Sequence, residues 1–192
     1  MNDPNIGLIL GIAIPVVVLS MPVISYNRFV RQKNHIRESW SNVDTELRRR
    51  YDLIPNLVQT VKGYAAHERA VLDEVTQARA GALSSTGPAG ERSSAETSLV
   101  GALRHLLVTV ENYPDLKASQ HFLELQQELA ITEDRIQAAR RFFNANVRDY
   151  NRRVQSFPAM VIARLFGFLI SDYFEVEAAI RTAGAPQVTL ES

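Results

Sequence analysis

One uncharged stretch near the N-terminus limits what this chain can fold into more than any other feature. Residues 6–24 read IGLILGIAIPVVVLSMPVI, 19 positions without a charged side chain. A helix of that length measures about 28 Å, close to the thickness of a bilayer's hydrocarbon core. The preceding MNDPN has no Lys or Arg, and no Ala-x-Ala follows, so the stretch is unlike a cleaved signal peptide. We therefore predict a transmembrane helix within residues 1–25, rather than a buried core helix.

The charges that flank this stretch predict its orientation. Only Asp3 precedes it, whereas Arg28, Arg31, Lys33 and Arg37 follow it closely. Positively charged flanks remain on the cytoplasmic side of a membrane. We expect a single-pass protein with its N-terminus outside and the bulk of the chain in the cytoplasm.

Two glycines and a proline within the predicted span affect the shape of that helix and its packing against other membrane helices. Gly7 and Gly11 form a GxxxG spacing that lets two membrane helices approach closely, although small residues are common in such helices. They are our candidates for membrane-helix packing. Pro15 removes one backbone donor, which predicts a kink rather than a break.

Beyond the predicted span, apolar residues recur at helical spacing, and no run alternates as strands do. The two first stripes are Phe29, Ile36, Trp40, Val43, Leu47 and then Ile54, Leu57, Val61, Tyr64, Val71, Val75, Ala78, Ala82. Between them lies RRRYDLIPN, where Asp52 can cap a new helix and Pro55 falls in its first turn. We predict a chain reversal there, with a kinked continuous helix as the alternative.

Two further helices complete the predicted fold. A Ser, Gly and Pro-rich loop spans residues 84–94, and Ser93 with Glu96 fits a capping box that starts the third helix. The sequence Tyr113-Pro114-Asp115 ends it, and a long fourth helix covers residues 119–155. We therefore predict an all-α protein: an N-terminal transmembrane helix, then an antiparallel up-and-down four-helix bundle with long helices over residues 26–157. The first bundle helix alternatively continues the membrane helix.

The segment after the bundle is unusually apolar. Residues 157–174 read FPAMVIARLFGFLISDYF, in which only Arg164 and Asp172 are charged. Residues 158–183 would cap the open end of the bundle, lie on the membrane surface, or pack against another subunit. Leu165, Phe166 and Phe168 are the candidate oligomer or membrane contacts. We expect residues 184–192 to form a flexible tail.

Four long sequence motifs resemble the LemA family. They are WSNVDTELRRRYDLIPNLVQTVKGYAAHE, YPDLKASQHFLELQQEL, TEDRIQAARRFFN and VRDYNRRVQSFP, in that order between residues 40 and 158. The resemblance implies a bacterial inner-membrane protein with an extracytoplasmic N-terminus and a cytoplasmic helical bundle. The family is itself similar to the magnetosome-membrane protein MamQ, which implies a role in organising membranes. Ser39 departs from the Ala that is common after Glu38 in the family.

Composition and motif spacing exclude several classes of function. The chain has no Cys, and 21 basic side chains balance 21 acidic ones, so thiol chemistry is excluded and nucleic-acid binding is not expected. No acid stands three residues before any of the four histidines, as a di-iron bundle requires, and His67-Glu68 does not extend to a zincin motif. We predict no cofactor, no metal and no small-molecule substrate.

The most polar motif is the RRRYDLIPN turn together with Glu68. Arg48, Arg49 or Arg50 could hold an anion while Asp52 or Glu68 acts as a base. The structural alternative, which we favour, is that Asp52 caps a helix and the arginines are solvated. Glu68 falls on an apolar stripe, so we expect it to pair with Arg50 and fix the helix register.

These observations predict a membrane-anchored, non-enzymatic scaffold. Its expected partners are membrane lipid, further copies of itself and other membrane proteins. A regulatory subunit of a membrane protease or transporter is one alternative, and an enzyme with an unrecognised metal or anion site is another.

Overall fold

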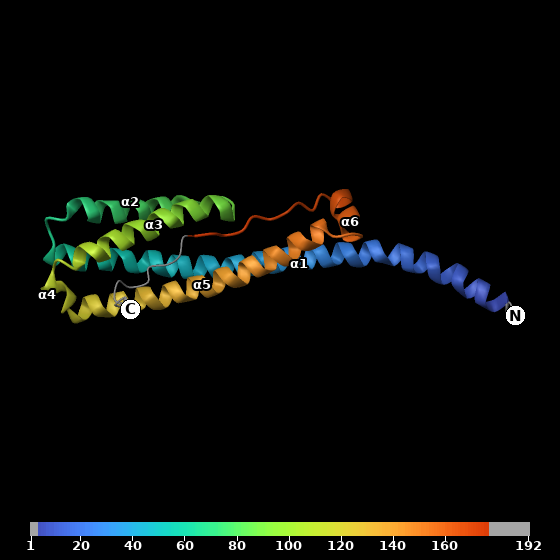
Figure 1. The fold of residues 1–192 in the computed structure, drawn as a ribbon, viewed down its shortest axis with the longest axis horizontal. Coiled ribbons are helices and arrows are strands. Elements are labelled where there is room, and N and C mark those ends of the chain that lie inside the picture. The colour runs from blue at the N-terminus through green and yellow to red at the C-terminus, as the bar shows by residue number, and fades with distance from the viewer. Residues whose placement is uncertain (1–3, 177–192) are drawn as a thin grey trace, which may run out of the picture. The chain divides into compact units, whose positions relative to one another are not determined.

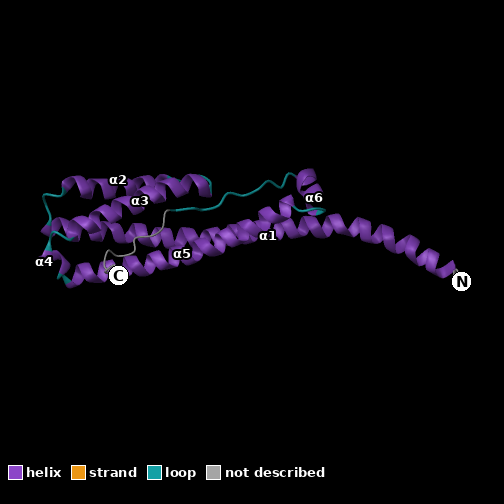
Figure 2. Cartoon of the chain, viewed as in Figure 1, coloured by secondary structure: helices purple, strands orange, loops and turns teal. Residues whose placement is uncertain are grey.

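The protein is helical throughout the part that the computed structural model describes. This part is residues 4–176, with side chains from residue 20 onward (Figure 1). Its helices are α1 Pro4–Tyr64, α2 Arg69–Ser84, α3 Ala89–Val110, α4 Pro114–Lys117, α5 Gln120–Gln155 and α6 Ala159–Phe166. No strand occurs between residues 4 and 176 (Figure 2). The prediction of an all-α protein is confirmed.

The predicted chain reversal in RRRYDLIPN is wrong, because α1 continues through it to Tyr64. Pro55 has no N–H to donate to the carbonyl of Tyr51, four residues earlier. That carbonyl instead accepts a hydrogen bond from Nε of Arg79 in α2, at 2.7 Å. The helix therefore passes Pro55 with the freed acceptor satisfied, and Asp52 lies exposed within α1 rather than at a helix start.

The capping box predicted for the third helix is also wrong. Helix α3 begins at Ala89, and Ser93 Oγ donates to the carbonyl of Ala89 at 2.8 Å, one turn back within the helix. Glu96 is buried and turned toward the core. The loop before α3 is accordingly shorter than predicted. The predicted end of the third helix at residues 113–115 lies close to Val110, where α3 ends, and the long helix over residues 119–155 agrees closely with α5. The short helix α4 was not predicted.

The chain divides into two compact units, which we describe separately. The second unit comprises residues 40–143 and 172–192, and its described part has an apolar core supplied by α1, α2, α3 and α5. Helices α2 and α3 lie side by side (Figure 1). The buried residues include Val43, Leu47, Ile54, Leu57, Val75, Leu99, Leu103, Leu106, Phe122 and Ile136. Tyr64, which the stripe placed in the core, is half exposed.

Aromatic contacts at Trp40 join the C-terminal residues to this second unit. The Trp40 ring lies 5.1 Å from the ring of Phe143 and 5.2 Å from the ring of buried Phe174, centroid to centroid. The guanidinium of Arg92 lies over the Trp40 ring at 5.1 Å. Part of the apolar C-terminal segment thus belongs to this core.

The first unit comprises residues 1–39 and 144–171. Its core is formed by Phe29, Tyr150 and Ala163, with Phe168 packed against them. Helix α6 ends at Phe166 and is followed by Gly167, which adopts a left-handed conformation (φ 70°) that favours glycine. The turn directs the chain back along α5, where the Tyr150 hydroxyl donates to the carbonyl of Leu169 at 2.8 Å.

Among the residues whose side chains are described, no helix has an apolar stretch long enough to cross a membrane. Most of the predicted span, including Gly7, Gly11 and Pro15, lies outside the residues whose side chains are described. Only its backbone, from Pro4 onward, is described, and it is part of α1. The transmembrane helix therefore stays a prediction.

Candidate functional site

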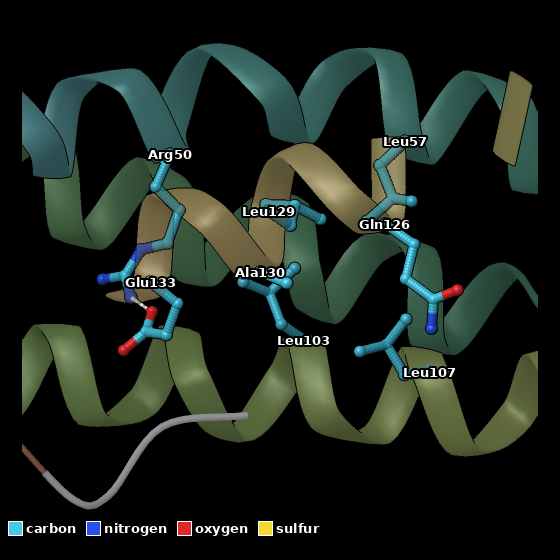
Figure 3. A pocket seen from close by; sticks show the side chains of 8 residues that line it. All are labelled: Arg50, Leu57, Leu103, Leu107, Gln126, Leu129, Ala130 and Glu133. Carbon is cyan, nitrogen blue, oxygen red and sulfur yellow. Dashed lines mark hydrogen bonds and ion pairs between the residues drawn. The ribbon is translucent and has the colours of Figure 1, made fainter. Parts of the chain in front are cut away.

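A group of buried charged side chains lies at the centre of the second unit. Arg50 of α1 is only 2% exposed. Its guanidinium forms ion pairs with Glu96 of α3 and with Glu133 of α5, the latter at 3.0 Å (Figure 3). The hydroxyl of the neighbouring Tyr51 also donates to the Glu96 carboxylate. Three helices are thus joined through one arginine, and α2 joins the same turn of α1 through the bond from Arg79 to the Tyr51 carbonyl.

Burial makes each member of this Arg50 network depend on the others. Removing a charge from water costs several kcal/mol, and only close pairing with hydrogen bonds offsets that cost. Burial, reinforced by the adjacent Glu96 carboxylate, raises the pKa of Tyr51 well above its ordinary value of 10. Tyr51 therefore stays a neutral donor to the Glu96 carboxylate.

A second ion-pair group surrounds Asp44 in the same unit. Its carboxylate accepts from Arg48 and from Arg92, both at 2.8 Å. Burial opposes ionisation of Asp44, but the hydrogen bonds from the two arginines outweigh it and lower the pKa below 3.8. This group joins α1 to α3.

The structure separates the residues of the predicted polar site. Arg48 pairs with Asp44, Arg49 lies 3.5 Å from Glu46, and only Arg50 points into the core. The predicted pair between Arg50 and Glu68 is wrong. Glu68 lies in the turn between α1 and α2. There it accepts a hydrogen bond from the Tyr113 hydroxyl at 2.8 Å.

Sequence reasoning missed the true partners of Arg50. Glu96 precedes the core residue Leu99 by three positions, and Glu133 follows Leu129 by four, so both carboxylates occupy core-facing positions of their helices. Glu68 has the same spacing, because it follows Tyr64 by four positions and precedes Val71 by three. Because Glu96 was interpreted as part of a capping box, its core-facing position was not recognised.

A small cavity of about 20 Å³ adjoins the Arg50 network, walled by Leu57, Leu103 and Leu129 (Figure 3). Its volume is that of roughly one water molecule, too small for an organic substrate. Within the described residues, no three acidic or histidine side chains gather as metal ligands. What the Arg50 network does visibly is join α1 to α3 and α5 through its ion pairs.

The predicted contacts of the C-terminal segment divide into two groups. Leu165 and Phe166 are exposed, at 73% and 52%. Phe168 instead stacks on Phe29, with ring centroids 4.8 Å apart, and lies 5.6 Å from the ring of Tyr26. The Phe166 ring likewise lies 4.9 Å from the ring of Tyr26, and Phe168 is half-buried. Contact of these three side chains with another subunit or a membrane stays a prediction.

These features define an all-helical protein whose second unit is organised by buried ion pairs. The chain belongs to the LemA family, which matches residues 39–190. This range includes Arg50, Glu96 and Glu133.

Named relatives agree with this assignment. Magnetosome protein MamQ of Magnetospirillum gryphiswaldense is 25% identical over 189 residues, covering 85% of this chain and 70% of that protein. Protein LemA of Metamycoplasma hominis is 28% identical over 158 residues, covering 79% and 70%. Magnetosome protein MamQ 2 of Paramagnetospirillum magneticum is 23% identical over 198 residues, covering 90% and 72%.

Proposed function

We propose that this LemA-family protein is a membrane-anchored, non-enzymatic scaffold that associates with copies of itself. The anchor is the uncharged stretch of residues 6–24 at the start of α1. The protein then crosses the bacterial inner membrane once, with its N-terminus outside and its helical bundle in the cytoplasm. The magnetosome names of two relatives favour a role at membranes.

One observation carries the scaffold proposal: the first unit exposes large apolar side chains outside its buried core. Leu165, Phe166, Leu169 and Ile170 are all at least half exposed. Exposed apolar clusters of this kind are typical of surfaces that bind another protein or a membrane. Confinement to a membrane raises the effective concentration of such a surface, so weak contacts suffice for assembly.

Replacing Leu165 and Phe166 by Ser tests self-association. We expect chemical crosslinking of the full chain in membranes to yield fewer oligomers, with helical content unchanged. Val108→Ser with Ile131→Ser is the matched control, because these side chains are similarly exposed in the second unit. Equal loss in both variants, or unchanged oligomers in the first, would refute this interface.

A reporter fused after Ser192 tests the anchor. A cytoplasmic reporter should be active and an extracytoplasmic one silent, because the positive charges follow the apolar stretch. The reverse result would overturn the proposed topology.

A further inference from the structure

The first unit contains a cavity of about 680 Å³ in which positive charge predominates. Its wall includes Arg28 and Arg31 of α1 and Arg152 and Arg153 of α5, against a single carboxylate, Asp149. None of the four arginines forms an ion pair within 4 Å in the described part of the chain. Four positive charges and one negative charge leave this wall with a net charge of +3.

The wall also holds polar atoms whose hydrogen-bonding capacity is unused. Arg153 Nε and Gln32 Oε1 are buried and have no partner among the described residues. Burial and the like charge of nearby Arg28 lower the pKa of Arg153, and Asp149 only partly opposes them. A buried donor without an acceptor is costly, so an anion between the arginines would accept from Arg153 Nε and reduce their mutual repulsion. Gln32 Oε1 is an acceptor and would need a different partner.

The position of the cavity along α1 indicates where the anion comes from. Arg28 and Arg31 follow Ile24, the last residue of the uncharged stretch, by four and seven positions. At 1.5 Å per residue they lie about 6 and 10 Å beyond it along the helix. Since each polar layer of a bilayer is about 5–8 Å thick outside the hydrocarbon core, this is close to the depth of the phospholipid phosphates. That inference rests on the proposed anchor.

The surroundings of the basic cavity favour a lipid over a free anion. Ile24 and Pro158 add apolar surface to the same wall. Phe157, immediately before Pro158, is exposed. A second cavity of about 570 Å³ in this unit is lined largely by apolar side chains, including Val154, Met160 and Phe168. A ligand with one phosphate and apolar chains complements the arginines and the apolar residues of the basic cavity's wall.

We propose that the arginine cavity of the first unit binds the phosphate of an anionic phospholipid. Guanidinium groups suit this ligand because they donate paired hydrogen bonds to phosphate oxygens. The lipid would neutralise charges that the chain itself leaves unpaired.

Native mass spectrometry of the full chain in detergent tests the proposal, with phosphatidylglycerol and phosphatidylcholine supplied in turn. We expect the wild type to retain phosphatidylglycerol preferentially. The variant Arg28→Gln with Arg152→Gln should lose about tenfold in affinity, since two charge-assisted contacts are removed. The matched control is Arg141→Gln with Arg148→Gln, which removes the same charge from exposed positions of α5 outside the cavity wall.

Three outcomes would overturn the lipid site. They are equal retention of both lipids, equal loss in the two double variants, and binding of inorganic phosphate with no preference for phosphatidylglycerol. Circular dichroism verifies that each variant keeps its helical content.

The failure of the anchor and the failure of the lipid site can be told apart. Resistance of the full chain to carbonate extraction from membranes reports on the anchor alone. A water-soluble, short-chain phosphatidylglycerol reports on the cavity alone, because its binding does not require membrane insertion.

Discussion

The two units of this chain treat buried and half-buried arginines in opposite ways. In the second unit, Arg50 is enclosed by two carboxylates and Arg92 is paired with Asp44. In the first unit, half-buried Arg153 shares a cavity wall with three exposed arginines and has no such partner among the described residues. The difference separates two uses of one residue type: an arginine whose charge is paired with carboxylates of other helices holds those helices together, whereas one without such a pair is available to an anionic ligand.

Replacing Arg50 by Ala should produce the largest loss of stability. Glu96 and Glu133 would stay buried without a cation, so the free energy of unfolding should fall by about 3–5 kcal/mol. Denaturant unfolding of the full chain, followed by circular dichroism, measures this change. Arg48→Ala is the control, because the Arg48 side chain is exposed and its ion pair with Asp44 should contribute little to stability. Equal effects of the two substitutions would contradict the role of the Arg50 network.

Tyr51→Phe should cost less, about 1.5–3 kcal/mol, because it removes one hydrogen bond to the buried Glu96 carboxylate. The substitution should also change how the free energy of unfolding depends on pH in alkaline solution. Unfolded Tyr51 ionises near pH 10, but the folded chain retains this proton to higher pH. The unfolded state is therefore favoured progressively above pH 10, and wild-type stability falls.

Removing the Tyr51 hydroxyl should make that alkaline loss shallower, as measured by unfolding between pH 9 and 11, a window chosen to bracket the ordinary tyrosine pKa of about 10. Tyr64→Phe provides the comparison, since this side chain is half exposed. An identical change in both variants would argue against a special environment at Tyr51.

Arg79→Ala should cost about 1–2 kcal/mol by leaving the Tyr51 carbonyl without a donor. Pro55→Ala restores a backbone N–H four residues after that carbonyl. The cost of Arg79→Ala should therefore shrink in the Pro55→Ala background, as a double-mutant cycle would measure. Additive effects would show that the guanidinium does not substitute for the missing helix bond.

The smallest effect should come from the first unit and have the opposite sign. Arg28→Gln removes a like charge near Arg153, so stability should stay within about 0.5 kcal/mol of the wild type or rise slightly. Thermal unfolding in a detergent free of anionic lipid measures this effect. A loss as large as that of Arg50→Ala would remove the distinction between the two units.

Helix content and much of the core could be predicted from the spacing of apolar residues. Ile54 and Leu57 lie in the core as that spacing indicates, and α5 agrees closely with its predicted range. The course of the chain at Pro55 could not be predicted, because it depends on a donor from Arg79, 24 positions later. The partners of Arg50 were equally non-local: several carboxylates occupy core-facing positions, and only the packing of α1 against α3 and α5 selects Glu96 and Glu133.

The bond from Arg79 to the Tyr51 carbonyl also has a consequence for the order of folding. A proline within a helix favours fraying at that point when the helix is isolated. The last turns of α1 therefore gain a compensating bond only when α2 has docked. We expect a peptide of residues 40–64 to be less helical after Pro55 than before it, and the end of α1 to form together with α2 as one cooperative step.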